Sequence, residues 1–397
     1  MKNIPLKAFG LVFLAAISTT LCGCRLPHPQ PSSAGRIDNA GNEIRRAELP
    51  LGQATTLAWV SDLNDAARYL AGMPGGINSV LGEARDSARW KLHQANVDEL
   101  WRQFSGYRQP RIEAFSQREL GPLRSAETVF YPFSGPDILF ATAFFPRASN
   151  YILCGLEGTE LLPQLSQLSA EQRETGLAGL YTTITTALNC SFFITKDMRV
   201  DLQRTEFKGT LPVMLVFLAR LGLNVESVTP IDFDPMGNVR QVTGKGSGFH
   251  IQCGGFLGNR KNIYYFQQNL ANEALPAKAS FLKFVANFGT CATYLKSASY
   301  LMHSEEFSTI RSAILSQSQG VLQDDSGIPF HSFSPENWNL HLYGNYTGVL
   351  DIFQGNFQPD LRDAYAQQTH HVEDINFGVG YKFAAGQSNL LLALRRH

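Results

Sequence analysis

The chain has 397 residues, of which 44% are hydrophobic and 17% are charged, a composition that is ordinary for a globular protein. Lysines plus arginines and aspartates plus glutamates both number 34, so the formal net charge is zero. A neutral chain lacks the basic field that draws proteins onto nucleic acid, and we therefore exclude DNA and RNA as expected partners.

The first residues of the chain have the layout of a secretory signal. Lys2 and Lys7 accompany an apolar run over residues 8–21, which is too short to span a bilayer, since about 20 residues are needed. Leu21-Cys22-Gly23-Cys24 then resembles the lipobox of bacterial lipoproteins. The resemblance implies that residues 1–23 are a signal peptide and that Cys24 is lipidated. The alternatives are an ordinary cleaved signal or an uncleaved anchor.

The residues after this motif favour a tether. Residues 24–50 are rich in Pro, Ser, Gly and Asn and contain few large apolar side chains, so they cannot bury enough surface to fold. Arg25 follows the lipidated Cys24, which in Gram-negative lipoproteins fits sorting to the outer membrane. We therefore expect a periplasm-facing protein whose partner is the membrane, reached through the N-terminal lipid, with an envelope polysaccharide or protein as a possible second partner.

The cysteines allow two interpretations in an exported protein. Apart from Cys22 in the signal region and Cys24, whose sulfur would carry the lipid, the chain contains Cys154, Cys190, Cys253 and Cys291. Four cysteines in an oxidising compartment allow two disulfides, with three possible connectivities. The alternative is buried free thiols, because cysteine is among the most buried residue types. No CxxC pair is present, so a zinc ribbon is not supported.

The pattern of apolar residues predicts a short helical segment over residues 51–125. Leu63, Ala66, Ala67 and Leu70 follow the spacing of one helix face. Residues 73–76, Met-Pro-Gly-Gly, stop that helix.

From residue 126 to residue 397 the pattern of apolar and turn residues predicts strands that alternate with helices. Expected strands are 128–133, 150–156, 191–195, 224–233, 241–253, 262–268, 291–297 and 320–323, followed by a mostly β section over 338–348, 375–383 and 389–394. Such alternation predicts an α/β fold with a largely parallel, Rossmann-like sheet and antiparallel additions.

The turn that follows the first expected strand is a candidate site. Ser134 lies in Phe133-Ser134-Gly135-Pro136-Asp137, and the carboxyl ends of strands are the edge where ligands bind in open α/β sheets. A serine here is a candidate nucleophile, although the elbow pattern G-x-S-x-G is absent because Pro132 and Pro136 stand at its two glycine positions. The alternative is that Ser134-x-x-Asp137 forms a helix capping box.

The same strand–helix–strand unit resembles a class I methyltransferase in layout. Glu157 ends the next expected strand, 22 residues after Gly135, and the resemblance implies that its carboxylate would hold a ribose. The loop has one glycine rather than a glycine-rich pattern, and such cofactors are not normally present outside the cytoplasm. We therefore expect the scaffold with no cofactor, and keep Asp137 and Glu157 as candidate ligand-binding residues.

Polar residues also follow two later strands. Lys296 follows the expected strand 291–297, and Asp324 and Asp325 follow the expected strand 320–323. An ion pair between Lys296 and one of these carboxylates could orient a polar substrate or shift a pKa. Lys296 and Asp324 are candidate catalytic residues and Asp325 a candidate ligand-binding residue, the alternative being a solvated turn and a surface lysine.

Two further segments are weaker candidates. Tyr343-Gly344-Asn345-Tyr346 is an aromatic loop of the kind that can stack on sugars, with Tyr343 as the candidate contact. His370-His371 with Glu373 could coordinate a metal, but the segment is expected to be a polar loop. We therefore predict no metal site.

Four blocks, FYPFSGPD, GLEG, LKSASYL and QDDSGIP, resemble a family of exported bacterial proteins of no assigned function. The resemblance spans roughly residues 125–395 and implies no reaction. The function we expect is therefore that of a membrane-anchored periplasmic lipoprotein that binds an envelope ligand or partner. A hydrolase acting on a cell-envelope polymer, and a structural assembly lipoprotein, are the alternatives.

Overall fold

The computed structural model describes residues 56–76, 78–193, 195–255, 260–274, 277–367, 372–384 and 386–396. The predicted signal peptide, Cys24, the tether and the His370-His371 pair lie outside these residues. Residues Val60–His397 form one compact unit. Within the described ranges, none of the helices combines the length and the apolar character that a membrane crossing requires.

The predicted helical segment is confirmed. Its helices are α2 (Thr56–Leu70), α3 (Gly82–Arg85), α4 (Ala88–Gln103) and α5 (Gln109–Glu119). Ala67 and Leu70, on the predicted apolar face of α2, are fully buried. They belong to the same apolar core as Phe140 and Tyr294 of the α/β part, so the segment is packed onto that part.

All the strands join one sheet in the order β10-β9-β11-β8-β7-β1-β2-β6-β5-β3-β4. Their bounds are β1 Thr128–Tyr131, β2 Asn150–Gly155, β3 Asn224–Phe233, β4 Val239–Gln241, β5 Gly248–Gly254, β6 Arg260–Gln267, β7 Cys291–Leu295, β8 Ser318–Gln323, β9 Trp338–Gly344, β10 Val372–Glu373 and β11 Asn389–Arg395. The fold class predicted from the sequence, α/β with antiparallel additions, is confirmed.

The centre of the sheet is parallel and doubly wound. Strands β6, β2, β1, β7 and β8 are neighbours in that order, and each adjacent pair is parallel. In chain order this is 3-2-1-4-5, the arrangement in which the winding reverses between the first and fourth strands. The switch point therefore lies between the carboxyl ends of β1 and β7, where ligands bind in such folds.

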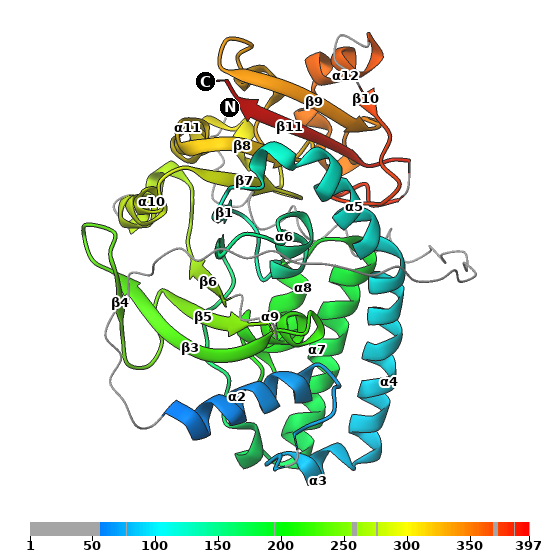
Figure 1. Ribbon diagram of the computed structural model, residues 1–397, viewed down its shortest axis with the longest axis vertical. Coiled ribbons are helices and arrows are strands. Elements are labelled where there is room, and N and C mark those ends of the chain that lie inside the picture. Colours follow the sequence, from blue (N-terminus) through cyan, green and yellow to red (C-terminus); the bar gives the residue numbers. More distant parts are fainter. Residues whose placement is uncertain are drawn as a thin grey trace, which may run out of the picture. The chain divides into compact units, whose positions relative to one another are not determined.

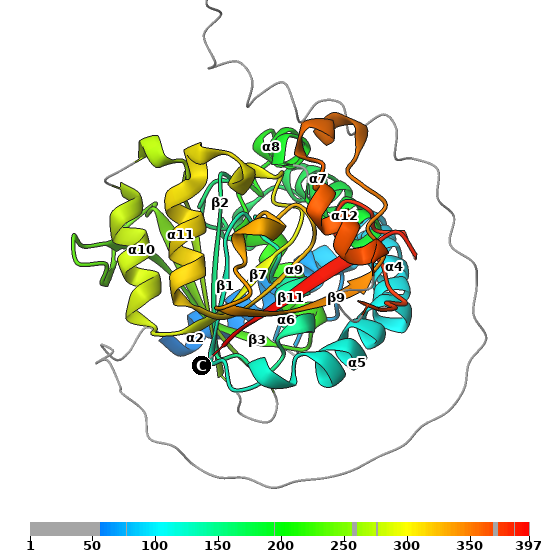
Figure 2. The same ribbon diagram turned by 90° about the horizontal axis from the view of Figure 1, so that it is seen from above.

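Helices cover both faces of this sheet. In Figure 2, α10 and α11 lie on one side of the strands and α4 and α5 on the other. Because side chains alternate along a strand, Tyr131 and Tyr294 belong to the core under α6 and α9, whereas Phe130 and Leu295 belong to the core under α10 and α11. The remaining helices are α6 Ile138–Phe144, α7 Ala170–Cys190, α8 Thr195–Gln203, α9 Leu211–Arg220, α10 Ala277–Asn287, α11 Ser308–Gln317 and α12 Pro359–Ala366.

Two expected strands are wrong. Over residues 191–193 the chain makes a turn, since Ser191 ends α7 in the left-handed conformation at φ 67° and α8 begins at Thr195. The apolar residues whose pattern predicted a strand lie in this turn. Among them, the ring of Phe192 contacts the ring of Tyr381. Residues 375–383 are likewise a connection between β10 and β11 (Figure 1).

The capping box considered for Ser134-x-x-Asp137 is wrong, whereas Ser169 and Gln172 form a reciprocal capping box at the start of α7. At α6, the N-cap is Asp137 itself, whose carboxylate accepts a hydrogen bond from the Phe140 amide at 3.2 Å. Ser134 lies three residues before this N-cap and does not cap the helix. Asp137 is thereby held at the switch point by the start of α6.

Candidate functional site

A buried ion pair fills the switch point. Lys296 Nζ lies 2.7 Å from Asp137 Oδ2, and the two side chains are 1% and 3% exposed. Lys296 follows β7 and Asp137 follows β1, so the pair joins the two strands between which the winding reverses. The sequence predicted Lys296 as an ion-pair partner of Asp324 or Asp325; the carboxylate that contacts its ammonium group is instead that of Asp137, and Asp324 acts on it only as a nearby charge.

The surroundings of Lys296 explain how its charge is held. Its ammonium group also donates to the carbonyl oxygen of Ser191 and lies 3.7 Å from the centroid of the Phe140 ring. Tyr131 donates its hydroxyl proton to Asp137 Oδ2 at 2.9 Å. Burial lowers the pKa of Lys296, and the attraction of Asp137 opposes that effect.

Asp324 is the second buried carboxylate of this group. It accepts hydrogen bonds from the amide of Ser297 at 2.9 Å and from the amide of Ser326 at 3.0 Å. Burial, and then the charge of Asp325, raise the pKa of Asp324 to about 7 despite these donors. A carboxyl group that titrates near neutral pH is suited to accept or donate a proton.

Asp325 points away from this group. Its oxygens accept from the hydroxyl of Tyr300 and from the amide of Asn389 at 2.9 Å. Burial is the main cause that raises the pKa of Asp325. The predicted pair of neighbouring aspartates is therefore divided between two environments, and only Asp324 lies beside Lys296.

Two buried hydroxyl groups at the switch point lack a hydrogen-bond partner among the described residues. They are Tyr294 Oη and Ser297 Oγ. Tyr294 is fully buried, and the nearby charges of Asp137 and Asp324 contribute to the rise of its pKa, after burial itself. Because an unpaired buried hydroxyl costs about 1–3 kcal/mol, such groups require an explanation.

The backbone around the group is strained. Among the described residues, those other than glycine with a positive φ are Phe133, Ser191, Ser297, Ser299 and Tyr300, with φ between 52° and 67°. Each of them follows β1 or β7, or is Ser191, whose carbonyl contacts Lys296. Backbone strain of this kind persists where surrounding structure over-determines it, and it concentrates at functional sites.

The connection between β10 and β11 closes over this edge. The amide of Gly380 donates to Ser191 Oγ at 3.1 Å, and the Tyr381 hydroxyl donates to the carbonyl of Ser297 at 2.9 Å. Gly380, at φ 74°, approaches Asp324 so closely that a Cβ atom there would lie 2.2 Å from Asp324 Oδ2. The group formed by Asp137, Lys296 and Asp324 is thereby sealed from solvent.

Ser134 is not placed as a nucleophile. Its hydroxyl lies within hydrogen-bond distance of the carbonyl oxygens of Gly135, at 2.9 Å, and Cys154, at 3.2 Å. Both neighbours are acceptors that cannot act as a general base, so the serine has no group to activate it. The catalytic role predicted for Ser134 is therefore not supported by its contacts.

Glu157 is enclosed rather than open to a ribose. It is 3% exposed, and Tyr265 donates to Glu157 Oε2 at 3.2 Å. A Cβ atom on Gly155 would lie 2.2 Å from the same oxygen, and one on Gly135 would lie 3.4 Å from Glu157 Oε1. The carboxylate therefore packs against the loop after β1, in the place where the methyltransferase-like layout would put a ribose.

The other candidates from the sequence that lie among the described residues pack within the fold and line no binding site. Tyr343 is 3% exposed, and its hydroxyl donates to Glu119 on α5 at 3.0 Å, so it packs between sheet and helix. Cys154, Cys253 and Cys291 are buried free thiols, so the two disulfides that the sequence allowed are not formed and the second interpretation holds for these three residues. No cluster of possible metal ligands occurs among the described residues.

No family model, no curated protein and no solved structure matches this chain. The functional interpretation therefore depends on the sequence motifs and on the geometry of the site. Lys296 and Asp324, predicted as catalytic residues, and Asp137, predicted as a ligand contact, are brought together at the switch point. Ser134, Glu157, Asp325 and Tyr343 are not part of that group.

Sequence reasoning missed several members of the site. Tyr294 lies two residues before Lys296 on β7, and period-two alternation could have placed both side chains on one face of the sheet. Ser297 follows Lys296 directly, at the end of the expected strand 291–297, and was given no role in the site. Ser191 could not have been found, because no local pattern brings the end of α7 to the end of β7.

Proposed function

We propose that this chain is a lipid-anchored protein of the bacterial envelope whose α/β unit binds a small polar ligand at the switch point of its sheet. The N-terminal sequence motif, with Cys24 as the lipidated residue, supports the anchoring and the periplasm-facing location at the outer membrane. The position of the polar group at the carboxyl ends of β1 and β7 supports the binding site.

The observation that carries the proposal is the pair of unpartnered hydroxyls, Tyr294 Oη and Ser297 Oγ, beside buried charges. The charged groups nearby are satisfied by one another and by the protein: Lys296 pairs with Asp137, and Asp324 accepts from two amides. A small polar ligand would supply the hydrogen bonds that the two hydroxyls lack. It would enter when the β10–β11 connection opens, since Gly380 and Tyr381 now close this edge.

One observation favours a second function. The pKa of Asp324, raised to about 7 by burial, matches the requirement for a general acid or base at neutral pH. Lys296 and Asp324 would then serve a hydrolase that acts on an envelope polymer. The first proposal is preferred because Ser134 has no base, and because the buried group presents no nucleophile to a large substrate.

Removal of one hydroxyl tests the proposal. Tyr294→Phe deletes a hydroxyl that has no protein partner, so we expect the free energy of unfolding of the ligand-free protein to rise by about 1 kcal/mol. Tyr151→Phe is the matched control, because this buried tyrosine donates to the Phe145 carbonyl at 2.7 Å, away from the switch point. It should lose about 1 kcal/mol. Denaturant titration measures both changes.

The ligand itself is sought by native mass spectrometry of the full chain, released from membranes in a neutral detergent. We expect a small adduct on the wild-type protein and on Tyr151→Phe, and no adduct on Tyr294→Phe. A wild-type protein without an adduct, or an adduct that Tyr294→Phe retains, contradicts binding at the switch point. Hydrolysis of envelope polymer that depends on Asp324 would favour the second function.

A further inference from the structure

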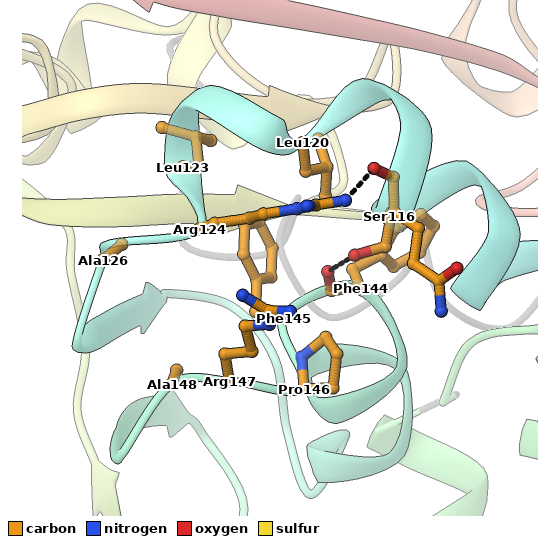
Figure 3. A pocket seen from close by; sticks show the side chains of 11 residues that line it. Ser116, Leu120, Leu123, Arg124, Ala126, Phe144, Phe145, Pro146, Arg147 and Ala148 are labelled. Carbon is orange, nitrogen blue, oxygen red and sulfur yellow. Dashed lines mark hydrogen bonds between the residues drawn. The ribbon is translucent and has the colours of Figure 1, made fainter. Parts of the chain in front are cut away.

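A separate cavity lies at the opposite, amino-terminal edge of the sheet. It has a volume of about 270 Å³ and lies between the end of α5, the segment before β1 and the connection from α6 to β2. Figure 3 shows its lining residues. Ala126 and Ala148, which precede β1 and β2, mark this edge, so the cavity is distinct from the switch point at the carboxyl ends of the same strands.

The cavity combines an apolar floor with a basic rim. Leu120, Leu123, Phe144 and Phe145 are almost fully buried and line its floor. The exposed members of the lining are Gln117, Arg124, Pro146 and Arg147. The two arginines come from different connections, before β1 and before β2, and in Figure 3 they extend from opposite sides of the cavity.

The charge of this lining is one-sided. It contains two arginines and no aspartate or glutamate. Arg124 donates to the carbonyl oxygen of Gln117, which uses one part of its guanidinium group, and no described residue forms an ion pair or hydrogen bond with the Arg147 side chain. A guanidinium group carries five N–H donors, so donors remain on both arginines for a carboxylate or phosphate group.

Carbonyl groups at the end of α6 would repel an anion if they were free. They are occupied: Ser116 donates its hydroxyl proton to the carbonyl of Phe144, and Tyr151 donates to that of Phe145 at 2.7 Å. Lys261 donates to the carbonyls of Pro146 at 2.8 Å and Ala148 at 2.9 Å. Its ammonium group adds a positive charge behind these two lining residues of the cavity. The negative end of α6 is thereby neutralised next to the cavity.

We propose that this cavity binds a small organic anion, with its apolar body against Leu120, Leu123 and Phe144 and its carboxylate or phosphate between Arg124 and Arg147. The volume of about 270 Å³ is slightly below the roughly 300 Å³ at which ligand pockets for drug-sized molecules begin. A compact aromatic or short aliphatic anion fits this size, whereas a two-chain phospholipid is too large.

Isothermal titration calorimetry of the full chain in neutral detergent at low ionic strength tests the site with three probes. 3-Phenylpropionate has both the apolar body and the charge, 3-phenylpropan-1-ol has only the apolar body, and inorganic phosphate has only the charge. We expect binding of the first probe, and affinities at least about tenfold weaker for the other two, a factor that corresponds to about 1.4 kcal/mol.

The arginine variants provide the second comparison. Arg124→Gln and Arg147→Gln should each weaken binding of 3-phenylpropionate about tenfold, again about 1.4 kcal/mol, because each removes charge-assisted hydrogen bonds. Arg89→Gln, at an exposed position on α4 outside the lining, is the matched control and should bind as the wild type does. Since Arg124 and Arg147 are exposed, their variants should unfold at the wild-type temperature.

Three outcomes overturn the proposal. The first is no heat of binding with 3-phenylpropionate. The second is equal affinity for the uncharged alcohol or for phosphate alone, which would remove either the anion or the apolar body from the ligand class. The third is an affinity that Arg124→Gln and Arg147→Gln leave unchanged, which would place the bound anion elsewhere on the molecule.

Discussion

At the scale of single residues, the Asp137–Lys296 pair contributes little net stability. Taking both charges out of water costs several kcal/mol per ion, and their attraction at 2.7 Å repays that cost only with good additional hydrogen bonds. Tyr131 and the Ser191 carbonyl supply such bonds. Because an apolar pair of similar volume would stabilise the fold at least as well, stability alone does not account for these charges.

The pKa of Asp324 makes stability depend on pH. Its pKa is about 7 in the folded protein, against about 3.9 in an unfolded chain. The folded state therefore binds the proton more tightly, and the resulting stabilisation is complete below pH 4 and is lost as the pH rises through 7. We expect the free energy of unfolding to fall by on the order of 3 kcal/mol between pH 4 and pH 7.5.

Asp324→Asn isolates this contribution from the other buried groups, Asp137, Lys296 and Asp325. The amide of asparagine cannot accept hydrogen bonds from Ser297 and Ser326 on both sides, so the variant should be less stable than the wild type at low pH. Its stability should nevertheless fall less between pH 4 and pH 7.5, as measured by urea titration. The same pH dependence in variant and wild type would show that Asp324 does not titrate in this range.

At the scale of helices and strands, local patterns predicted most elements and few of their partners. The strands 128–131 and 291–295 were expected within two residues because buried β-rich runs end at turn residues. The pairing of β1 with β7 joins segments that are far apart in the sequence, and no local pattern of residues indicates it. Lys296 was consequently expected to pair with Asp324 or Asp325, and its contact with Asp137 could not be predicted.

The β10–β11 connection is the element that seals the switch point, and Gly380 is its point of closest approach. A Cβ atom at Gly380 would lie 2.2 Å from Asp324 Oδ2, on a residue whose φ is 74°. We expect Gly380→Ala to lower the free energy of unfolding by about 3 kcal/mol, from backbone strain and overpacking together. Denaturant titration measures this change.

Gly386→Ala is the matched control in the same connection. Gly386 has a φ of 78°, and no described atom lies within 4 Å of a Cβ atom there. The substitution therefore introduces the backbone strain alone, about 1–2 kcal/mol. Equal losses at the two glycines would mean that the connection yields easily above Asp324 and does not seal it.

At the scale of the whole molecule, the unit Val60–His397 folds with no disulfide at Cys154, Cys253 or Cys291. Cys154, Cys253 and Cys291 are buried, and burial raises the pKa of the first two to about 12. Thiols that stay protonated are poor nucleophiles, so they resist oxidation even in an oxidising compartment. The unit has two apolar cores, one on each face of the sheet, and cores of this extent stabilise a fold without disulfide bonds.

The proposed membrane anchoring depends on Cys24, the residue that the resemblance to a lipobox marks for lipidation. Without the lipid-accepting sulfur of Cys24, a lipoprotein precursor is not modified. We therefore expect Cys24→Ser to abolish incorporation of labelled palmitate and to leave an unprocessed precursor. Cys22→Ser is the matched control, because Cys22 lies in the segment 1–23 that the proposed processing would remove, so its variant should be labelled and processed. A mature, unlabelled Cys24→Ser protein in the soluble fraction would instead indicate an ordinary cleaved signal, and the two proposed sites would then belong to a freely diffusing protein.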